Sequence, residues 1–111
     1  MPALPKAPAT YQQFIKQFPA LGKAWDLTAE AGQCGPLDAK SVRLIKLAIA
    51  MGAMREGAVH AGVRKALAAG ATQDEIDQVI ALAAGTLGFP SVVALFSWTR
   101  DLVAGPKRRR R

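Results

Sequence analysis

Apolar residues recur at intervals of three or four along most of the chain, the spacing that places them on one face of a helix. The first such segment begins at Thr10, a suitable N-cap, and Pro19 ends or kinks it. A second segment extends from Pro19 to about Ala31, and the glycines and proline of residues 32–36 then break the pattern. The chain up to residue 36 therefore predicts two helices.

Two further helices are predicted around a short turn. Asp38 is a good N-cap for a helix whose apolar side chains continue through residue 49. We place the turn at residues 52–55, so that the next helix begins by Glu56. Gly70 is a fitting residue just beyond the end of that helix.

The last part of the chain predicts a fifth and a sixth helix. Thr72 and Glu75 have the spacing of a capping box, in which each side chain bonds the backbone of the other residue. Gly88 and Pro90 are predicted to end this helix, and Ser91 to open the last one.

The whole pattern predicts an all-α protein with one domain of about six helices joined by short turns. Strand-like alternation and hairpin signals are absent from the sequence. The expected organisation is an extended arm at residues 1–9, a helical domain at residues 10–104 and a basic, disordered tail at residues 105–111.

Charge adds a feature of the C-terminus rather than of the helical domain. The net charge is +7, but five of the fifteen basic residues lie in Lys107–Arg111, and the remainder of the chain is nearly balanced. Such a run can attract nucleic acid or an anionic surface, or it can be a solvated tail. The tail has no interleaved aromatic residues, and the chain lacks helix-turn-helix and zinc-finger spacings, which argues against nucleic acid as a partner.

The N-terminus and the apolar segments bear on location. The first eight residues are proline-rich and have no apolar run of the signal-peptide type. The most apolar stretch, residues 44–54, is too short to cross a bilayer. Cys34 is the only cysteine, which excludes an internal disulfide and is compatible with a reducing compartment. We therefore expect a cytoplasmic protein without a membrane partner.

The segment of residues 37–103 resembles the carboxymuconolactone decarboxylase and alkylhydroperoxidase D family. The resemblance is carried, in order, by residues 37–40, 43–48, 56–60, 63–72, 74–76 and 88–90. It implies an antiparallel all-α bundle and a homo-oligomer, typically a trimer or a hexamer. It also implies one of two activities: decarboxylation of a lactone of aromatic catabolism, or peroxidase chemistry by a Cys-x-x-Cys pair with a histidine and an upstream glutamate.

The family positions for the peroxidase chemistry hold other residues in this chain. Counted back from Gly70, the cysteines are replaced by Arg55 and Ala58, the histidine by Gly62 and the glutamate by Arg43. Peroxidase chemistry needs a thiolate nucleophile and a resolving thiol, so these replacements argue against it. Cys34 lies upstream without a second cysteine or a basic cluster beside it, and we interpret it as incidental.

His60 is the strongest candidate for chemistry, because it is the only histidine. On a helix, Glu56 lies one turn before it and Arg64 one turn after it. We hypothesise that His60 and Glu56 are an acid/base pair and that Arg64 binds substrate, in a cofactor-free decarboxylase-like lyase or isomerase that acts on a small organic acid or lactone. This hypothesis expects a concave pocket that contains His60.

Other interpretations of these residues stay open. The three side chains fit an exposed charged stripe, or a histidine paired structurally at a subunit interface. The chain would then be a non-catalytic, oligomeric ligand-binding or interaction protein on the same scaffold. Surplus apolar surface on six short helices also favours self-association. With one histidine and one cysteine, we expect no metal site and no cofactor.

The remaining candidates have two interpretations each. Arg43 and Lys46 can bind an anion or extend to the surface, and we favour the surface. Four large apolar side chains can line a pocket or belong to the core or an interface, and we favour the second interpretation: Met51, Phe89, Phe96 and Trp98.

Overall fold

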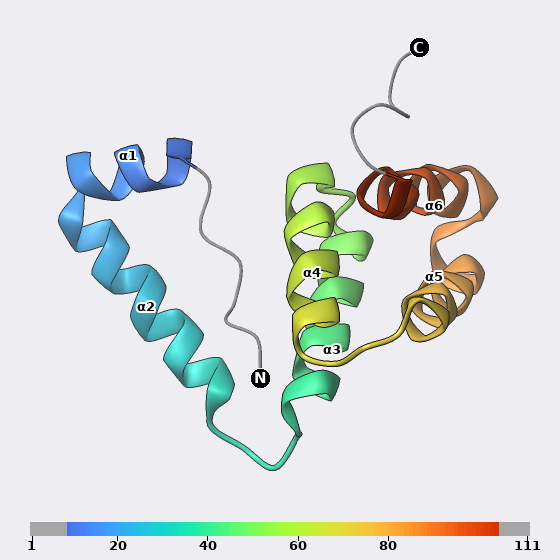
Figure 1. Ribbon diagram of the computed structural model, residues 1–111, viewed down its shortest axis with the longest axis horizontal. Coiled ribbons are helices and arrows are strands. Elements are labelled where there is room, and N and C mark those ends of the chain that lie inside the picture. The colour runs from blue at the N-terminus through green and yellow to red at the C-terminus, as the bar shows by residue number, and fades with distance from the viewer. Residues whose placement is uncertain (1–8, 105–111) are drawn as a thin grey trace. The chain divides into compact units, whose positions relative to one another are not determined.

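The computed structural model describes residues 9–104, with side chains as far as residue 101, and every regular element in this range is a helix (Figure 1). The helices are α1 (Ala9–Gln17), α2 (Pro19–Gln33), α3 (Ala39–Gly52), α4 (Glu56–Ala68), α5 (Gln73–Leu87) and α6 (Phe89–Ala104). The predicted all-α class is confirmed. The proposed tail and all but Ala9 of the proposed arm lie outside the described residues.

The chain divides into two compact units, one with α1 and α2 and the other with α3 to α6. Within the first unit, Pro19 occupies the first position of α2, where its missing N–H costs no helical hydrogen bond. Gly22 is buried, and a Cβ atom placed on it would lie 3.1 Å from Cβ of Ile15. α1 and α2 therefore pack closely at this glycine. α2 ends at Gln33, two residues after the predicted end, and the exposed Cys34 follows.

The second unit begins with the predicted cap of α3. The Asp38 side chain accepts a hydrogen bond of 2.7 Å from the backbone N–H of Ser41, which also holds the pKa of this carboxyl below its usual value. α3 and α4 are joined by the three residues 53–55 and lie side by side (Figure 1). The turn includes Met54 with a φ of 53°, and α4 begins at Glu56 as predicted.

The capping box of α5 is formed as predicted. The Thr72 hydroxyl accepts a bond of 3.1 Å from Glu75 N–H, and Thr72 N–H donates one of 2.9 Å to the Glu75 side chain. The predicted start of the last helix is wrong by two residues, because α6 begins at Phe89 and not at Ser91. Pro90 fits there because the first turn of a helix tolerates proline.

A single apolar core holds α3 to α6 together. Its buried side chains are Leu47, Met51, Val59, Val63, Ala66, Ala71, Ile76, Ile80 and Leu95. Thr99 of α6 is also fully buried, and its hydroxyl donates a 2.9 Å hydrogen bond to the carbonyl of Phe96. Leu95 and Thr99 fix the face that α6 turns inward, and this sets the position of the residues that follow.

Two ion pairs connect α5 to its neighbours within this unit. Lys40 Nζ of α3 lies 2.9 Å from Oε2 of Glu75. The hydrogen bond that Lys40 donates is the main reason that the pKa of Glu75 lies below the usual value of a glutamate. Arg100 of α6 makes two bonds of 3.1 Å to the carboxylate of Asp77, which lowers the pKa of Asp77 in the same way. None of the described helices is long and apolar enough to cross a membrane.

Candidate functional site

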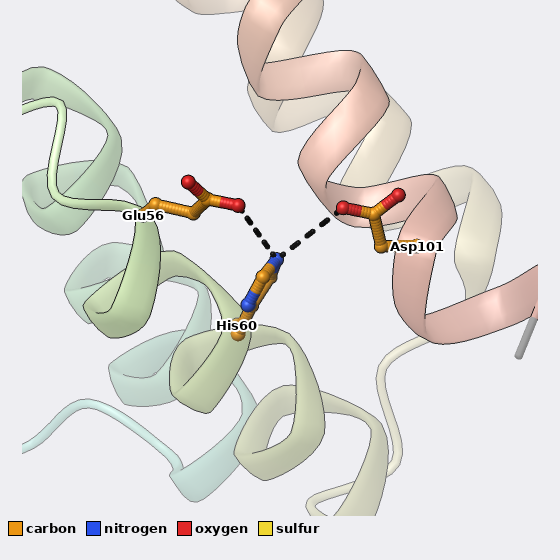
Figure 2. A group of neighbouring side chains, drawn as sticks. All are labelled: Glu56, His60 and Asp101. Atoms are coloured by element: carbon orange, nitrogen blue, oxygen red, sulfur yellow. Dashed lines mark ion pairs between the residues drawn. The ribbon is translucent and has the colours of Figure 1, made fainter. Parts of the chain in front are cut away.

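Three polar side chains from α4 and α6 converge on one point. His60 Nε2 lies 3.8 Å from Oε2 of Glu56 and 3.8 Å from Oδ2 of Asp101. Figure 2 shows the imidazole between the two carboxylates, with Glu56 one turn away on its own helix and Asp101 on the facing one. The predicted pairing of Glu56 with His60 on one helical face is therefore present, and Asp101 is a third member.

Local packing explains this convergence. Val59 and Val63 of α4 are fully buried, so His60, next to Val59, lies at the edge of the face that α4 presents to the core. On α6, Thr99 is fully buried, and Asp101 lies two residues further along at the rim of the contact. Because α4 and α6 pack against each other, the two rims meet.

The imidazole nitrogen in this group is covered but has no hydrogen-bond partner among the described residues. Nε2 of His60 is buried, while the side chains of His60, Asp101 and Glu56 are 21%, 31% and 53% exposed. Hydrogen bonds from nitrogen to oxygen are about 2.7–3.2 Å long, so neither carboxylate bonds Nε2 at 3.8 Å. A buried nitrogen without a partner is costly, which favours a cation or a ligand group between the three side chains.

The proposed substrate-binding residue Arg64 lies one turn beyond His60 and is half-buried. Among the described residues it makes no ion pair with Glu56 or Asp101. It belongs instead to a group of basic side chains on α3 and α4. Burial is the main reason that the pKa of Lys65 lies below its usual value, and three neighbouring positive charges lower it further: Arg43, Lys46 and Arg64.

A separate cavity of about 550 Å³ lies between α3 and α5. Its lining is mainly apolar and comprises Leu44, Ile45, Ala48, Glu75, Gln78, Val79, Leu82, Ala83, Thr86 and Leu87. His60, Glu56 and Arg64 do not line this cavity, so the pocket expected around His60 stays a prediction.

The large apolar side chains considered for a pocket do not line this cavity either. Met51 is fully buried in the core, and Trp98 packs against it. Phe96 is exposed and lies beneath the guanidinium of Arg100, 4.1 Å from the ring centroid, and Phe89 is also exposed.

Three of the positions where the family can carry its redox centre lie at the start of α4 or within it. Arg55 precedes α4 as its N-cap residue, and Ala58 is exposed on the first turn. A Cβ atom on Gly62 would lie 3.0 Å from Cδ1 of Leu47, so this position is where α4 approaches α3. The only thiol, Cys34, belongs to the other unit and bonds a backbone carbonyl of α2.

Asp101 is the member of the site that sequence reasoning missed. It lies 41 positions after His60, and no motif connects the two. The only available signal was its place in the predicted last helix, between Thr99 and Leu102 of the apolar face. The expectation of no metal site rested on the numbers of histidines and cysteines alone, although carboxylates are also metal ligands.

The comparison with known families agrees with the helical fold and with the resemblance seen in the sequence. The profile of the carboxymuconolactone decarboxylase family matches residues 19–101, and the chain therefore belongs to this family. No curated protein and no solved structure matches the chain.

Proposed function

We propose that the chain is a carboxymuconolactone decarboxylase-like lyase or isomerase in which His60 transfers a proton. The observation that supports this proposal most directly is the position of Nε2, covered and without a hydrogen bond to a described residue, between two carboxylates at 3.8 Å. Because no described residue bonds Nε2, its single donor or acceptor position is available to a substrate atom.

The three side chains have different parts in this proposal. His60 gives a proton to the substrate or takes one from it. Asp101, whose carboxylate lies 3.8 Å from Nε2, stabilises by its negative charge the imidazolium that forms when Nε2 takes up a proton. Glu56, the most exposed of the three and the first residue of α4, is the side chain that can rotate away to admit a substrate.

The charge of the site restricts the substrate. Two carboxylates beside one imidazole repel a second anion, which disfavours a substrate carboxylate at Nε2 itself. A neutral lactone carbonyl fits there. If the substrate is a small organic acid, its carboxylate belongs at Arg64, one turn along α4, where the guanidinium can bind it in a bidentate manner.

Deuterium exchange tests this function whatever product the reaction gives. Carboxylated and neutral five-membered lactones are incubated with the protein in D₂O and followed by NMR for deuterium incorporation and loss of CO₂. We expect exchange or decarboxylation of at least one lactone by the wild type, and none by His60→Gln. Asp74→Asn on α5, an exposed residue outside the site, is the control and keeps the activity. If no lactone reacts, or if His60→Gln is as active as the wild type, the proposal fails.

We also propose that the chain self-associates through the α3–α5 cavity, whether or not it is catalytic. The support is the apolar lining of that cavity, together with Leu82 and Ile45, whose side chains are exposed at its rim. Exposed apolar surface of this kind marks protein-interaction or ligand-binding sites, and here a second copy is the occupant we propose. Light scattering after size exclusion should give an oligomer for the wild type and a monomer for Leu82→Glu.

Val93→Glu on α6 is the matched control for that experiment. Val93 is also exposed but does not line the cavity, so its substitution should leave the oligomer intact. A monomeric wild type would refute self-association. The outcome that indicates a non-catalytic scaffold is different. In that outcome the wild type associates, no lactone reacts, and His60→Gln changes neither result.

A further inference from the structure

We infer that Glu56, His60 and Asp101 form a binding site for a divalent transition-metal ion of the Zn²⁺ class. Each residue offers one ligand atom, and these three atoms lie within 4.8 Å of one another. The inference concerns the same side chains as the proposed proton transfer, but it does not rest on that function.

The geometry is close to that of a metal site. Bonds of about 2.0–2.2 Å place two ligands of a tetrahedral zinc about 3.3–3.5 Å apart. The two distances from Nε2 are 3.8 Å, so each carboxylate has to approach it by about 0.3–0.5 Å. Side-chain rotation supplies such a movement, since Glu56 is 53% exposed and neither carboxylate makes a hydrogen bond to a described residue that would hold it.

The electrostatics favour a cation at this point. Glu56 and Asp101 bring two negative charges to a nitrogen that lacks a partner among the described residues (Figure 2). Arg100, the residue before Asp101, is engaged elsewhere because both of its terminal nitrogens bond Asp77. A divalent ion would balance both carboxylates and give Nε2 a ligand bond.

The donor set indicates the class of ion. One imidazole with two carboxylates suits Zn²⁺, Co²⁺ or Mn²⁺ better than Mg²⁺, which prefers oxygen ligands alone. Three protein ligands leave at least one position for solvent, as in catalytic rather than structural zinc sites. The exposed side of Glu56 gives the ion a way in.

Metal binding and proton transfer at His60 exclude each other. An ion on Nε2 occupies the lone pair that would otherwise accept the proton. If both proposals hold, Zn²⁺ inhibits the lactone reaction, and chelator-treated protein shows the full rate. Activity of the metal-free protein therefore tests the proton-transfer proposal, whereas metal affinity tests this one.

The binding experiment uses the full chain without a histidine tag, treated with chelator and titrated with Zn²⁺ by calorimetry. Co²⁺ is added to a second sample and followed by its visible absorption. We expect one ion per chain, no measurable binding by His60→Ala, and affinity weaker by at least about tenfold for Asp101→Asn. Mg²⁺ should not displace the bound Co²⁺.

Two control variants separate this site from adventitious binding. Cys34→Ser removes the exposed thiol, the other side chain that can bind zinc strongly, and Asp74→Asn removes an exposed carboxylate at the start of α5. Both should bind as the wild type does. The inference is overturned if His60→Ala still binds, if Cys34→Ser loses binding, or if the wild type takes up no ion.

Discussion

The close approach of α4 to α3 at Gly62 gives a prediction whose size follows from the structure. A Cβ atom at this position would lie 3.0 Å from Cδ1 of Leu47 and 3.4 Å from its Cα atom. Gly57, in the same helix, has no atom within 4 Å of the corresponding point. Gly62→Ala and Gly57→Ala therefore make the same chemical change, once against a neighbouring helix and once in open space.

The two effects at Gly62 oppose each other. Replacing a helical glycine by alanine stabilises a helix by up to about 1 kcal/mol. An extra methyl group in a packed contact costs about 1–3 kcal/mol. We expect Gly62→Ala to lower the free energy of unfolding by about 0–2 kcal/mol, and Gly57→Ala to raise it by up to about 1 kcal/mol. The difference between the two variants, about 1–3 kcal/mol, measures the packing term.

Urea unfolding followed by far-ultraviolet circular dichroism measures both variants at one fixed protein concentration. Leu47→Val removes the atom nearest to the added methyl group, so Gly62→Ala should cost less in that background, with a coupling energy of about 0.5–3 kcal/mol. The reasoning is refuted if Gly62→Ala is as stable as Gly57→Ala, or if the substitutions at 62 and 47 are additive.

Further predictions concern the capping box, the core and the loss of stability at acid pH. Thr72→Ala should cost about 0.5–2 kcal/mol in urea unfolding, since it removes the cap of α5. Leu95→Ala should cost about 2–5 kcal/mol, whereas Val93→Ala, at a residue 64% exposed and outside the α3–α5 cavity, should stay within about 0.5 kcal/mol; equal losses would contradict the described core. The pKa values of Glu75 and Asp77 are lowered from 4.5 and 3.8, so below about pH 4.5 the unfolded chain takes up these protons first. Stability at neutral pH should therefore be lost as pH falls through this range, and Asp77→Asn should flatten the loss seen in thermal melts.

Much of the fold was predictable because its signals are local. The caps at Asp38 and Thr72 act within three residues, and each was predicted at the residue where the structure has it. The start of α6 was misplaced because proline was interpreted as a terminator. The first turn of a helix accepts proline, and Gly88 alone, with a φ of 88°, makes the connection from α5.

The site was only half predictable for a related reason. Glu56 and His60 are on one helix, so their spacing in the sequence fixes their distance in space. Asp101 comes from α6, and its place beside His60 depends on how the buried faces of α4 and α6 meet. That contact is decided by packing. The apolar pattern identifies the buried face of each helix, but it does not show which two faces pack together.

The convergence of these side chains on one nitrogen can be tested directly because the chain has a single imidazole. In ¹⁵N-labelled protein, the Nε2 resonance of His60 is observed without overlap from other histidines. We predict that Glu56→Gln and Asp101→Asn each shift this resonance, because each removes a negative charge 3.8 Å away, and that Asp74→Asn leaves it in place. A resonance that responds to Glu56→Gln but not to Asp101→Asn would contradict the three-residue site.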